Sequence, residues 1–333
     1  MRNLFTLLFV FCSLAAANAA GKYDNPDTIV VARDGTGEFR TVGEAIEVCR
    51  AFMDYHKVIF IKKGIYKEKL IIPSWLQNIE LCGEDRDKTV ITYDDHANIK
   101  SFLPAPSQPG GEMQPMGTFR TYTLKIEGND ITLTNLTIEN NSARLGQAVA
   151  LHTEGDRLVF RNCRFIGHQD TVYTGVADTR LFFYQCYICG TTDFIFGPST
   201  AWFEECTIES LINSYATAAS TPQNQPYGYI FSHCRLIAAP GVDKVYLGRP
   251  WRDYGYTLFM NCELGSHIRP EGWHHWEKQR EQTARYYEYN NSGEGARPDA
   301  RVAWSRQLTR KEAQQVTLEH VFHRSDNWTP TWP

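Results

Sequence analysis

The sequence lacks a strong excess of charge of either sign, and this absence excludes several kinds of partner. Its 333 residues include 34 Lys and Arg against 38 Asp and Glu, which gives a formal net charge of −4. A nearly balanced charge gives no reason to expect binding to nucleic acid or to an acidic membrane surface. The chain also lacks an internal linker or a low-complexity tract, so we expect a single domain over residues 20–333, with a monomer as the default.

Long apolar runs are absent beyond the first residues of the chain. Residues 1–19, MRNLFTLLFVFCSLAAANA, have a basic start, a short apolar run and a small-residue cleavage signal that ends at Ala19. The run is too short to be a membrane span, and this pattern is typical of a secretory signal peptide. We therefore expect a mature chain that begins near Ala20, is secreted or periplasmic, and has no membrane contact after cleavage.

Signals for two common kinds of catalytic site are also missing. The chain has no G-x-S-x-G sequence, so the usual nucleophile of a serine esterase is not visible. It has no acidic cluster suited to calcium. His274 and His275 are adjacent in sequence, which suits a surface loop better than a metal site. We expect neither a metal nor a cofactor.

Short strand-like segments recur along the chain, and most of them carry one cysteine. Cys163, Cys186, Cys206, Cys234 and Cys262 share an x-C-x-apolar pattern and are 23, 20, 28 and 28 residues apart. Coils of this length indicate an all-β fold, a right-handed parallel β-helix, whereas a β-propeller needs longer repeats. Export would permit disulfides. Equivalent positions of a solenoid point the same way, however, so we expect a ladder of buried thiols.

Two capping boxes mark expected helices near the ends of the chain. Thr41 and Glu44 open residues 41–55, where apolar residues occur at helical intervals, and Thr309 and Glu312 open a second helix in a C-terminal extension. The first helix would cover the edge strands at the N-terminal end of the solenoid. Residues 101–117 are expected to form a long surface loop, which either borders a groove or only joins two coils.

Three polar residues repeat at one interval, because Gln147, Asp170 and Asp193 are each 23 positions apart. Equivalent positions of a parallel solenoid stack in neighbouring strands, roughly 4.8 Å apart. We therefore expect one amide and two carboxylates in a single column. Two carboxylates that close cannot both ionise freely, so one pKa should rise and the pair can divide into an acid and a nucleophile. The structural alternative is that each Asp only caps a turn.

The sequence motifs resemble those of pectin methylesterases, the esterases that hydrolyse the C6 methyl ester of galacturonate in pectin. The resemblance runs from about residue 27 to residue 305, and its implied fold is the same right-handed β-helix. The matching motifs, in family order, are GIYKEK (64–69), GQAVAL (146–151), GHQDTVY (167–173), TTDFIFG (191–197), LGRPW (247–251), EGWHHW (271–276) and YYEYNNSGEGA (286–296). The implied partner is a polysaccharide, methyl-esterified homogalacturonan.

The resemblance also implies roles for individual residues. Asp193 corresponds to the nucleophile and Asp170 to the general acid and base. Gln147 and Gln169 correspond to amides that stabilise an oxyanion, and Arg249 to the residue that orients the nucleophile. The expected sugar-binding residues are Trp251, Tyr173, Phe196, Trp276 and Phe119. Aromatic residues also fill cores and cover solenoid ends, which is the structural alternative for this last group.

Three other functions remain as alternatives. A glycosidase on the same fold would also use paired Asp residues, but it would create reducing ends, whereas an esterase releases methanol and leaves polymer length unchanged. A polysaccharide lyase would favour a calcium cluster and a basic residue for proton abstraction. A non-catalytic polysaccharide-binding solenoid would bind pectin equally well whether or not Asp193 is intact.

Overall fold

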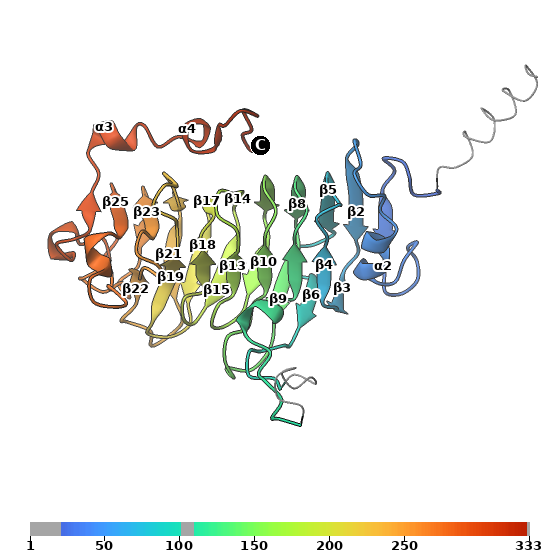
Figure 1. Cartoon of the computed structure of the whole chain (residues 1–333), viewed down its shortest axis with the longest axis horizontal. Helices are drawn as coiled ribbons and strands as arrows, with labels where there is room; N and C mark the ends of the chain where they lie inside the picture. Colours follow the sequence, from blue (N-terminus) through green and yellow to red (C-terminus); the bar gives the residue numbers. More distant parts are fainter. Residues whose placement is uncertain (1–20, 101–109, 332–333) are drawn as a thin grey trace, which may run out of the picture.

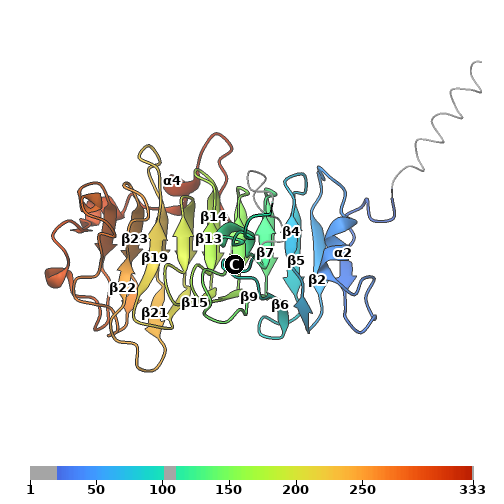
Figure 2. The same cartoon turned by 60° about the horizontal axis from the view of Figure 1, so that its bottom comes forward.

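A computed structural model describes residues 21–100 and 110–331. The expected signal segment, residues 1–19, lies outside the described residues, as do residues 101–109 of the long loop. The described chain is a right-handed parallel β-helix, in which three parallel sheets run side by side along the long axis (Figures 1 and 2). Within the described ranges, no helix is both long and apolar enough to cross a lipid bilayer.

Successive coils contribute strands to each of the three sheets, as the 20- to 28-residue repeat predicts. In spatial order, the eleven-stranded sheet contains β1 (Ile29–Val31), β2 (Lys57–Ile61), β5 (Ile79–Gly83), β8 (Ile131–Thr134), β11 (Leu158–Arg161), β14 (Arg180–Tyr184), β17 (Thr200–Glu204), β20 (Tyr229–Ser232), β23 (Tyr256–Met260), β25 (Arg285–Tyr289) and β26 (Arg306–Gln307). The seven-stranded sheet contains β22 (Tyr246–Gly248), β19 (Tyr215–Ala219), β16 (Ile195–Gly197), β13 (Val172–Thr174), β10 (Leu151–Thr153), β7 (Leu124–Ile126) and β4 (Leu70–Ile72). The eight-stranded sheet contains β24 (Glu263–Leu264), β21 (Arg235–Ala238), β18 (Thr207–Ser210), β15 (Tyr187–Gly190), β12 (Arg164–Ile166), β9 (Thr137–Asn140), β6 (Thr89–Tyr93) and β3 (Gly64–Lys67).

Each strand-like segment that carries a ladder cysteine holds two strands rather than one. Two residues separate the strands, the ladder cysteine and, before it, a residue with a positive φ, such as Asn162 between β11 and β12 at +48°. The same position in the following coils is filled by Gln185, Glu205, His233 and Asn261, with φ between +51° and +55°. This tight turn moves the chain from the eleven-stranded to the eight-stranded sheet. Sequence periodicity does not reveal it, because the apolar pattern continues across the turn.

The interior of the solenoid contains stacks of equivalent side chains, and the expected cysteine ladder is confirmed. Its five cysteines are at most 1% exposed, and all eight cysteines of the described ranges are free. Their thiols contact carbonyl oxygens of the preceding coil, as Cys186 Sγ does with Phe160 O at 3.5 Å. A parallel stack of rings, with centroids 4.4–4.5 Å apart, is formed by Phe160, Phe183, Phe203, Phe231 and Phe259.

Short helices lie near both ends of the described chain. They are α2 (Val42–Glu47), α3 (Arg310–Ala313) and α4 (Leu318–Phe322), and the 3₁₀ turns are η1 (Thr118–Arg120), η2 (Arg280–Gln282) and η3 (Pro298–Ala300). Both expected capping boxes are present, at Thr41 and at Thr309. Helix α2 is shorter than the expected span of residues 41–55, because it ends at Glu47, and Phe52 in the segment that follows has a left-handed backbone with a φ of +56°.

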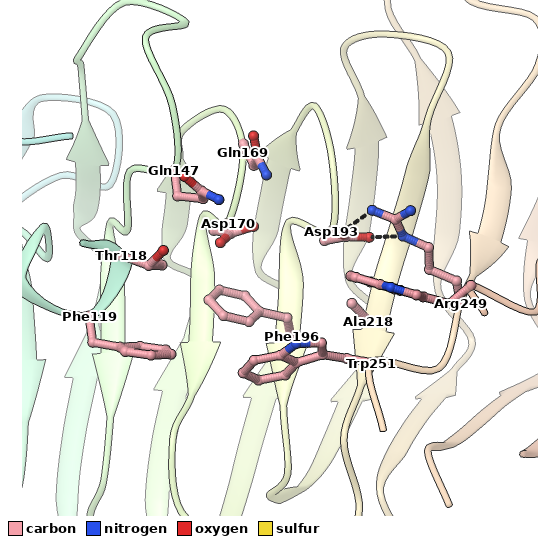
Figure 3. A pocket seen from close by; sticks show the side chains of 11 residues that line it. Thr118, Phe119, Gln147, Gln169, Asp170, Asp193, Phe196, Ala218, Arg249 and Trp251 are labelled. Atoms are coloured by element: carbon pink, nitrogen blue, oxygen red, sulfur yellow. Dashed lines mark hydrogen bonds and ion pairs between the residues drawn. The ribbon is translucent and has the colours of Figure 1, made fainter. Parts of the chain in front are cut away.

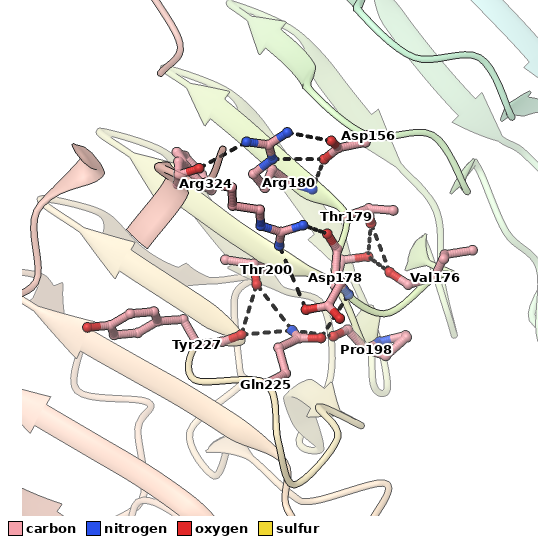
Figure 4. Close-up of polar contacts among 12 residues, drawn as sticks. Asp156, Val176, Asp178, Thr179, Arg180, Pro198, Thr200, Gln225, Tyr227 and Arg324 are labelled. Atoms are coloured by element: carbon pink, nitrogen blue, oxygen red, sulfur yellow. Dashed lines mark hydrogen bonds and ion pairs between the residues drawn. The ribbon is translucent and has the colours of Figure 1, made fainter. Parts of the chain in front are cut away.

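The C-terminal strap, residues 310–331, returns from the end of the solenoid toward its middle (Figure 1). Phe322 of α4 is fully buried against side chains of the eleven-stranded sheet. Arg180, only 2% exposed, links the strap to that sheet through two carboxylates. It donates to Asp156 at 3.1 and 2.6 Å, as Figure 4 shows, and to Asp326 of the strap at 2.7 and 2.5 Å.

Candidate active site

Nine of the ten expected site residues surround one cavity of about 260 Å³ beside the seven-stranded sheet. The residues that line it are Thr118, Phe119, Gln147, Gln169, Asp170, Asp193, Phe196, Ala218, Arg249, Trp251 and Trp276. The tenth expected residue, Tyr173, is not among the lining residues, but its ring lies 4.8 Å from that of Phe119 and 4.6 Å from that of Phe196, its register partner. Side chains from the coils of β7, β10, β13, β16, β19 and β22 therefore converge at this point.

Asp170 and Asp193 occupy equivalent positions of neighbouring coils. The register pairs Val172 of β13 with Ile195 of β16. Asp170 lies two residues before Val172, and Asp193 lies two residues before Ile195. Both have a left-handed backbone, with φ of +67° at Asp170 and +49° at Asp193. Asp tolerates this conformation better than most residues, and such strain is characteristic of functional sites. The expected pair of stacked carboxylates is therefore present.

Gln147 does not belong to that column, and this part of the prediction was wrong. The register pairs Leu151 with Val172, an offset of 21 residues instead of the 23 that separate Val172 from Ile195. As a result Ala148 N–H, and not that of Gln147, donates to Gln169 O beside Asp170. Because this coil is shorter, Gln147 is displaced along the chain direction relative to the two carboxylates. Its side chain still lines the cavity, on the same side of the carboxylates as that of Gln169 (Figure 3).

Arg249 binds one of the two carboxylates in a two-pronged ion pair. Its Nε and Nη2 donate to Asp193 Oδ1 at 2.9 Å and to Oδ2 at 2.6 Å (Figure 3). Arg249 follows β22, and its own N–H donates to Thr217 O of the preceding coil. The chain stays extended there, so Trp251 projects on the same side two residues later. The carboxyl group of Asp170, by contrast, has no hydrogen bond or ion pair to another described residue.

The surroundings separate the protonation behaviour of the two carboxyl groups. Burial raises the pKa of Asp170 well above its usual range, and the nearby charge of Asp193 raises it further. Burial also raises the pKa of Asp193, but hydrogen bonds and positive charge from Arg249 oppose this effect. Such an arrangement favours a neutral Asp170 beside an anionic Asp193 at intermediate pH.

Aromatic rings form the opposite wall of the cavity. Figure 3 shows the rings of Phe119, Phe196 and Trp251 on one side of the carboxylates, with the two glutamines on the other. Phe196 is only 4% exposed, whereas Phe119 is 48% exposed and offers a free face. The wall is therefore apolar with a solvent-facing rim, as is typical of a site for a sugar.

Two residues of the lining were not identified from the sequence. Ala218 pairs with Phe196 in the strand register at an offset of 22 residues (218 − 196 = 22), which none of the cysteine spacings of 20, 23 or 28 residues gives. Thr118 belongs to η1, directly after the long loop, and no repeat marks it. Its position also shows that the C-terminal part of this loop leads to the cavity, which the sequence left open.

Asp170→Asn is expected to stabilise the fold at neutral pH. In the unfolded chain Asp170 ionises near pH 4, but in the folded protein its pKa is raised, so stability falls as pH rises above about 4. An amide removes this penalty, which should raise the free energy of unfolding by on the order of 1–2 kcal/mol at pH 7. Chemical denaturation at pH 7 and at pH 3.5 measures the difference, which should be smaller at the lower pH. An equally stable or less stable variant at pH 7 would contradict this account.

Comparisons with known proteins agree with this geometry. The sequence matches the pectinesterase family over residues 28–325. It is 34% identical to pectinesterase QRT1 of Arabidopsis thaliana over 311 residues, which cover 90% of this chain and 78% of that protein. It spans about half the length of several other relatives, which are named pectinesterase/pectinesterase inhibitor.

Solved structures give the same result. Pectin methylesterase from carrot superimposes with a TM-score of 0.81 at 32% identity, covering 89% of this chain and 93% of that one. A pectin methylesterase in complex with a hexasaccharide has a TM-score of 0.75 at 30% identity, covering 92% of this chain and 98% of that one. The chain therefore belongs to the pectinesterase family and is a carboxylic ester hydrolase with pectin methylesterase activity.

Proposed function

We propose that the chain removes C6 methyl esters from homogalacturonan with Asp193 as nucleophile and Asp170 as general acid and base. The observation that carries this assignment is the asymmetry of the pair. Arg249 holds two hydrogen bonds to Asp193, whereas the carboxyl of Asp170 has no ion pair among the described residues. The paired group is suited to remain an anion, and the unpaired buried group is suited to remain an acid.

The first half of the reaction forms an ester-derived anhydride. An oxygen of the Asp193 carboxylate attacks the C6 carbonyl carbon, and the carbonyl oxygen becomes an oxyanion. When the tetrahedral intermediate collapses, the bond between C6 and the methoxy oxygen breaks. Asp170 donates its proton to that oxygen, so methanol leaves as a neutral molecule.

The second half restores both groups. Asp170, now ionised, accepts a proton from water, and the hydroxyl oxygen attacks C6 of the anhydride. Collapse of the second tetrahedral intermediate releases Asp193 as a carboxylate and leaves a carboxylic acid on the sugar, which then loses its proton to solvent. Asp170 is again protonated, so the pair is ready for another cycle.

Both intermediates carry an oxyanion, and the two glutamines are placed to stabilise it. Gln147 and Gln169 line the cavity together on one side of the carboxylates (Figure 3). Their side-chain amides are N–H donors, and one such donor contributes roughly 3–4 kcal/mol in acyl-transfer sites. The second donor spreads the developing charge over two hydrogen bonds.

The aromatic wall suits the apolar faces of sugar rings. Phe119, Phe196, Trp251 and Trp276 line the cavity, and the ring of Tyr173 stacks on that of Phe196. A hexasaccharide is far larger than a cavity of about 260 Å³, so the polymer would extend along the surface on either side of the reacting unit. The similar pectin methylesterase solved in complex with a hexasaccharide supports binding of a substrate longer than the reacting unit.

Localisation and domain organisation are part of the same proposal. The pattern of residues 1–19 and a polymeric substrate support an exported protein, secreted or periplasmic, with residues 20–333 acting as one catalytic domain and as a monomer. The family match over residues 28–325 supports the extent of this domain.

The decisive assay compares methanol release with the formation of reducing ends on highly esterified pectin. The proposal predicts one new carboxylate for each methanol and no new reducing ends. New reducing ends without methanol would indicate a glycosidase, and unsaturated products would indicate a lyase. Binding of pectin without any product would identify a non-catalytic solenoid.

A further inference from the structure

The guanidinium group of Arg249 lies between two aromatic rings. Its Cζ is 3.9 Å from the ring centroid of Tyr215 and 3.8 Å from that of Trp276. Both distances are well within the range of cation–π contacts. With a ring over each face, the guanidinium group donates hydrogen bonds only along its edge. Two of these edge N–H groups donate to Asp193.

Each ring of this pair is itself held in place. Tyr215 stacks on Tyr246 of the next coil, with centroids 5.3 Å apart and planes 11° from parallel, and its carbonyl accepts the N–H of Asp193 at 2.8 Å. Trp276 has a φ of +63°, and its N–H donates to His274 Nδ1 at 3.0 Å. The ring of His274 in turn contacts the ring of Tyr215, with centroids 5.3 Å apart.

We propose that Tyr215 and Trp276 are positioning residues, which hold the Arg249 guanidinium in the plane that keeps Asp193 aimed at the ester. This inference rests on the proposed role of Asp193 as nucleophile. Two stacked rings restrict the rotation of Arg249 about its side-chain bonds, so the ion pair is preorganised before substrate arrives. The rings also exclude water from both faces of the cation, which strengthens its attraction to Asp193.

Tyr215 separates this role from substrate binding. Trp276 lines the cavity, so its loss would change contacts with the sugar as well. Tyr215 is not among the described residues that line the cavity, and it acts on the reaction only through Arg249 and the backbone of Asp193. The charged or titratable groups near Asp193 include Asp170, Arg249 and the buried Tyr286, and of these Arg249 stabilises the Asp193 anion, so a weaker hold on Arg249 should raise the pH at which Asp193 ionises.

The test compares Tyr215→Leu with Tyr215→Phe in the full-length protein. Removing the aromatic face is expected to lower kcat by roughly 10- to 100-fold with KM within about 2-fold, and to move the acid limb of the kcat/KM profile to higher pH. Tyr215→Phe keeps the face and should retain most of the activity. Tyr287→Leu is the matched control, because Tyr287 is another half-buried tyrosine stacked with an arginine, Arg306, at 5.4 Å. Its kcat should not change.

Each result decides between positioning and a merely structural role. A Tyr215→Leu protein with a lower melting temperature but unchanged kcat and pH profile would overturn the inference. If that variant does not fold, Trp276→Leu removes the other face and should lower kcat as well as change KM. Should the wild type release no methanol, the proposed function fails, and the crystal structure of Tyr215→Leu becomes the test. Two intact hydrogen bonds from Arg249 to Asp193 there would refute the positioning role, and their loss would support it.

Discussion

Replacing Asp193 by Asn is expected to lower kcat for methanol release by at least about 10⁴-fold, the scale on which the loss of a covalent nucleophile acts. An amide oxygen is a far weaker nucleophile than a carboxylate, and the anhydride intermediate cannot form. The variant should stay folded, because Asn also tolerates the left-handed backbone at this position, with its φ of +49°. Its amide oxygen can still accept a hydrogen bond from Arg249. Single-turnover assays on esterified pectin, with circular dichroism for the fold, measure both.

Asp130 offers a closely matched control for this substitution. It also has a left-handed backbone, with φ of +57°, and it also receives two hydrogen bonds from one arginine, Arg157, both at 2.6 Å. It lies away from the cavity that holds Asp193. Asp130→Asn should therefore weaken a similar ion pair without changing kcat. A folded Asp193→Asn protein with normal turnover would rule out the proposed nucleophile.

Arg180→Leu is expected to cause a large loss of stability. It removes the buried one of two cations that bind both Asp156 and Asp326, and leaves only Arg157, which is 3.2 Å from Asp156 and 3.5 Å from Asp326. Breaking a buried ion pair in this way costs about 3 kcal/mol, toward the low end of the known range because both carboxylates reach solvent. The strap should then detach, which exposes the apolar side chains under Phe322. Denaturant unfolding and hydrogen exchange of residues 310–331 measure the two effects.

The same link predicts a loss of stability in acid. Hydrogen bonds from Arg180 hold the pKa of Asp326 below its usual range, so this carboxylate stabilises the fold above about pH 4 and loses its effect as pH falls through the folded-state pKa.

Arg306→Leu serves as a control for Arg180→Leu, because Arg306 is 57% exposed and pairs only at the surface. Its cost should stay below about 1 kcal/mol. An Arg180→Leu protein as stable as this control would show that the strap is held by apolar packing alone.

The parts of the site that could be predicted from the sequence are those that repeat with the coils. Asp170 and Asp193 follow Cys163 and Cys186 by seven residues each, and the structure keeps both pairs in equivalent positions. A repeat predicts equivalent positions only while the coil length is constant. Gln147 precedes a coil whose register is two residues shorter, so the 23-residue spacing predicted the wrong position for it.

The remaining features depend on contacts that no local pattern records. Tyr215 packs on Arg249, which is 34 residues further along the chain (249 − 215 = 34), in a region where loop lengths vary. Arg180 meets Asp326 across 146 residues. A capping box predicts where the first helix of the strap begins. It does not predict which sheet the strap covers, because the apolar residues of such a short helix could pack on many surfaces.

The equal distance of each acid from the ladder cysteine of its own coil suggests how such a site can originate. In a stacked architecture, tandem copying of one 23-residue unit inserts a new rung directly against its parent, with every side chain aligned to its original. A single acid that faces the cavity in one ancestral coil would thereby become a pair at equivalent positions of neighbouring coils. Divergence then needs to supply only one cation beside one of the copies.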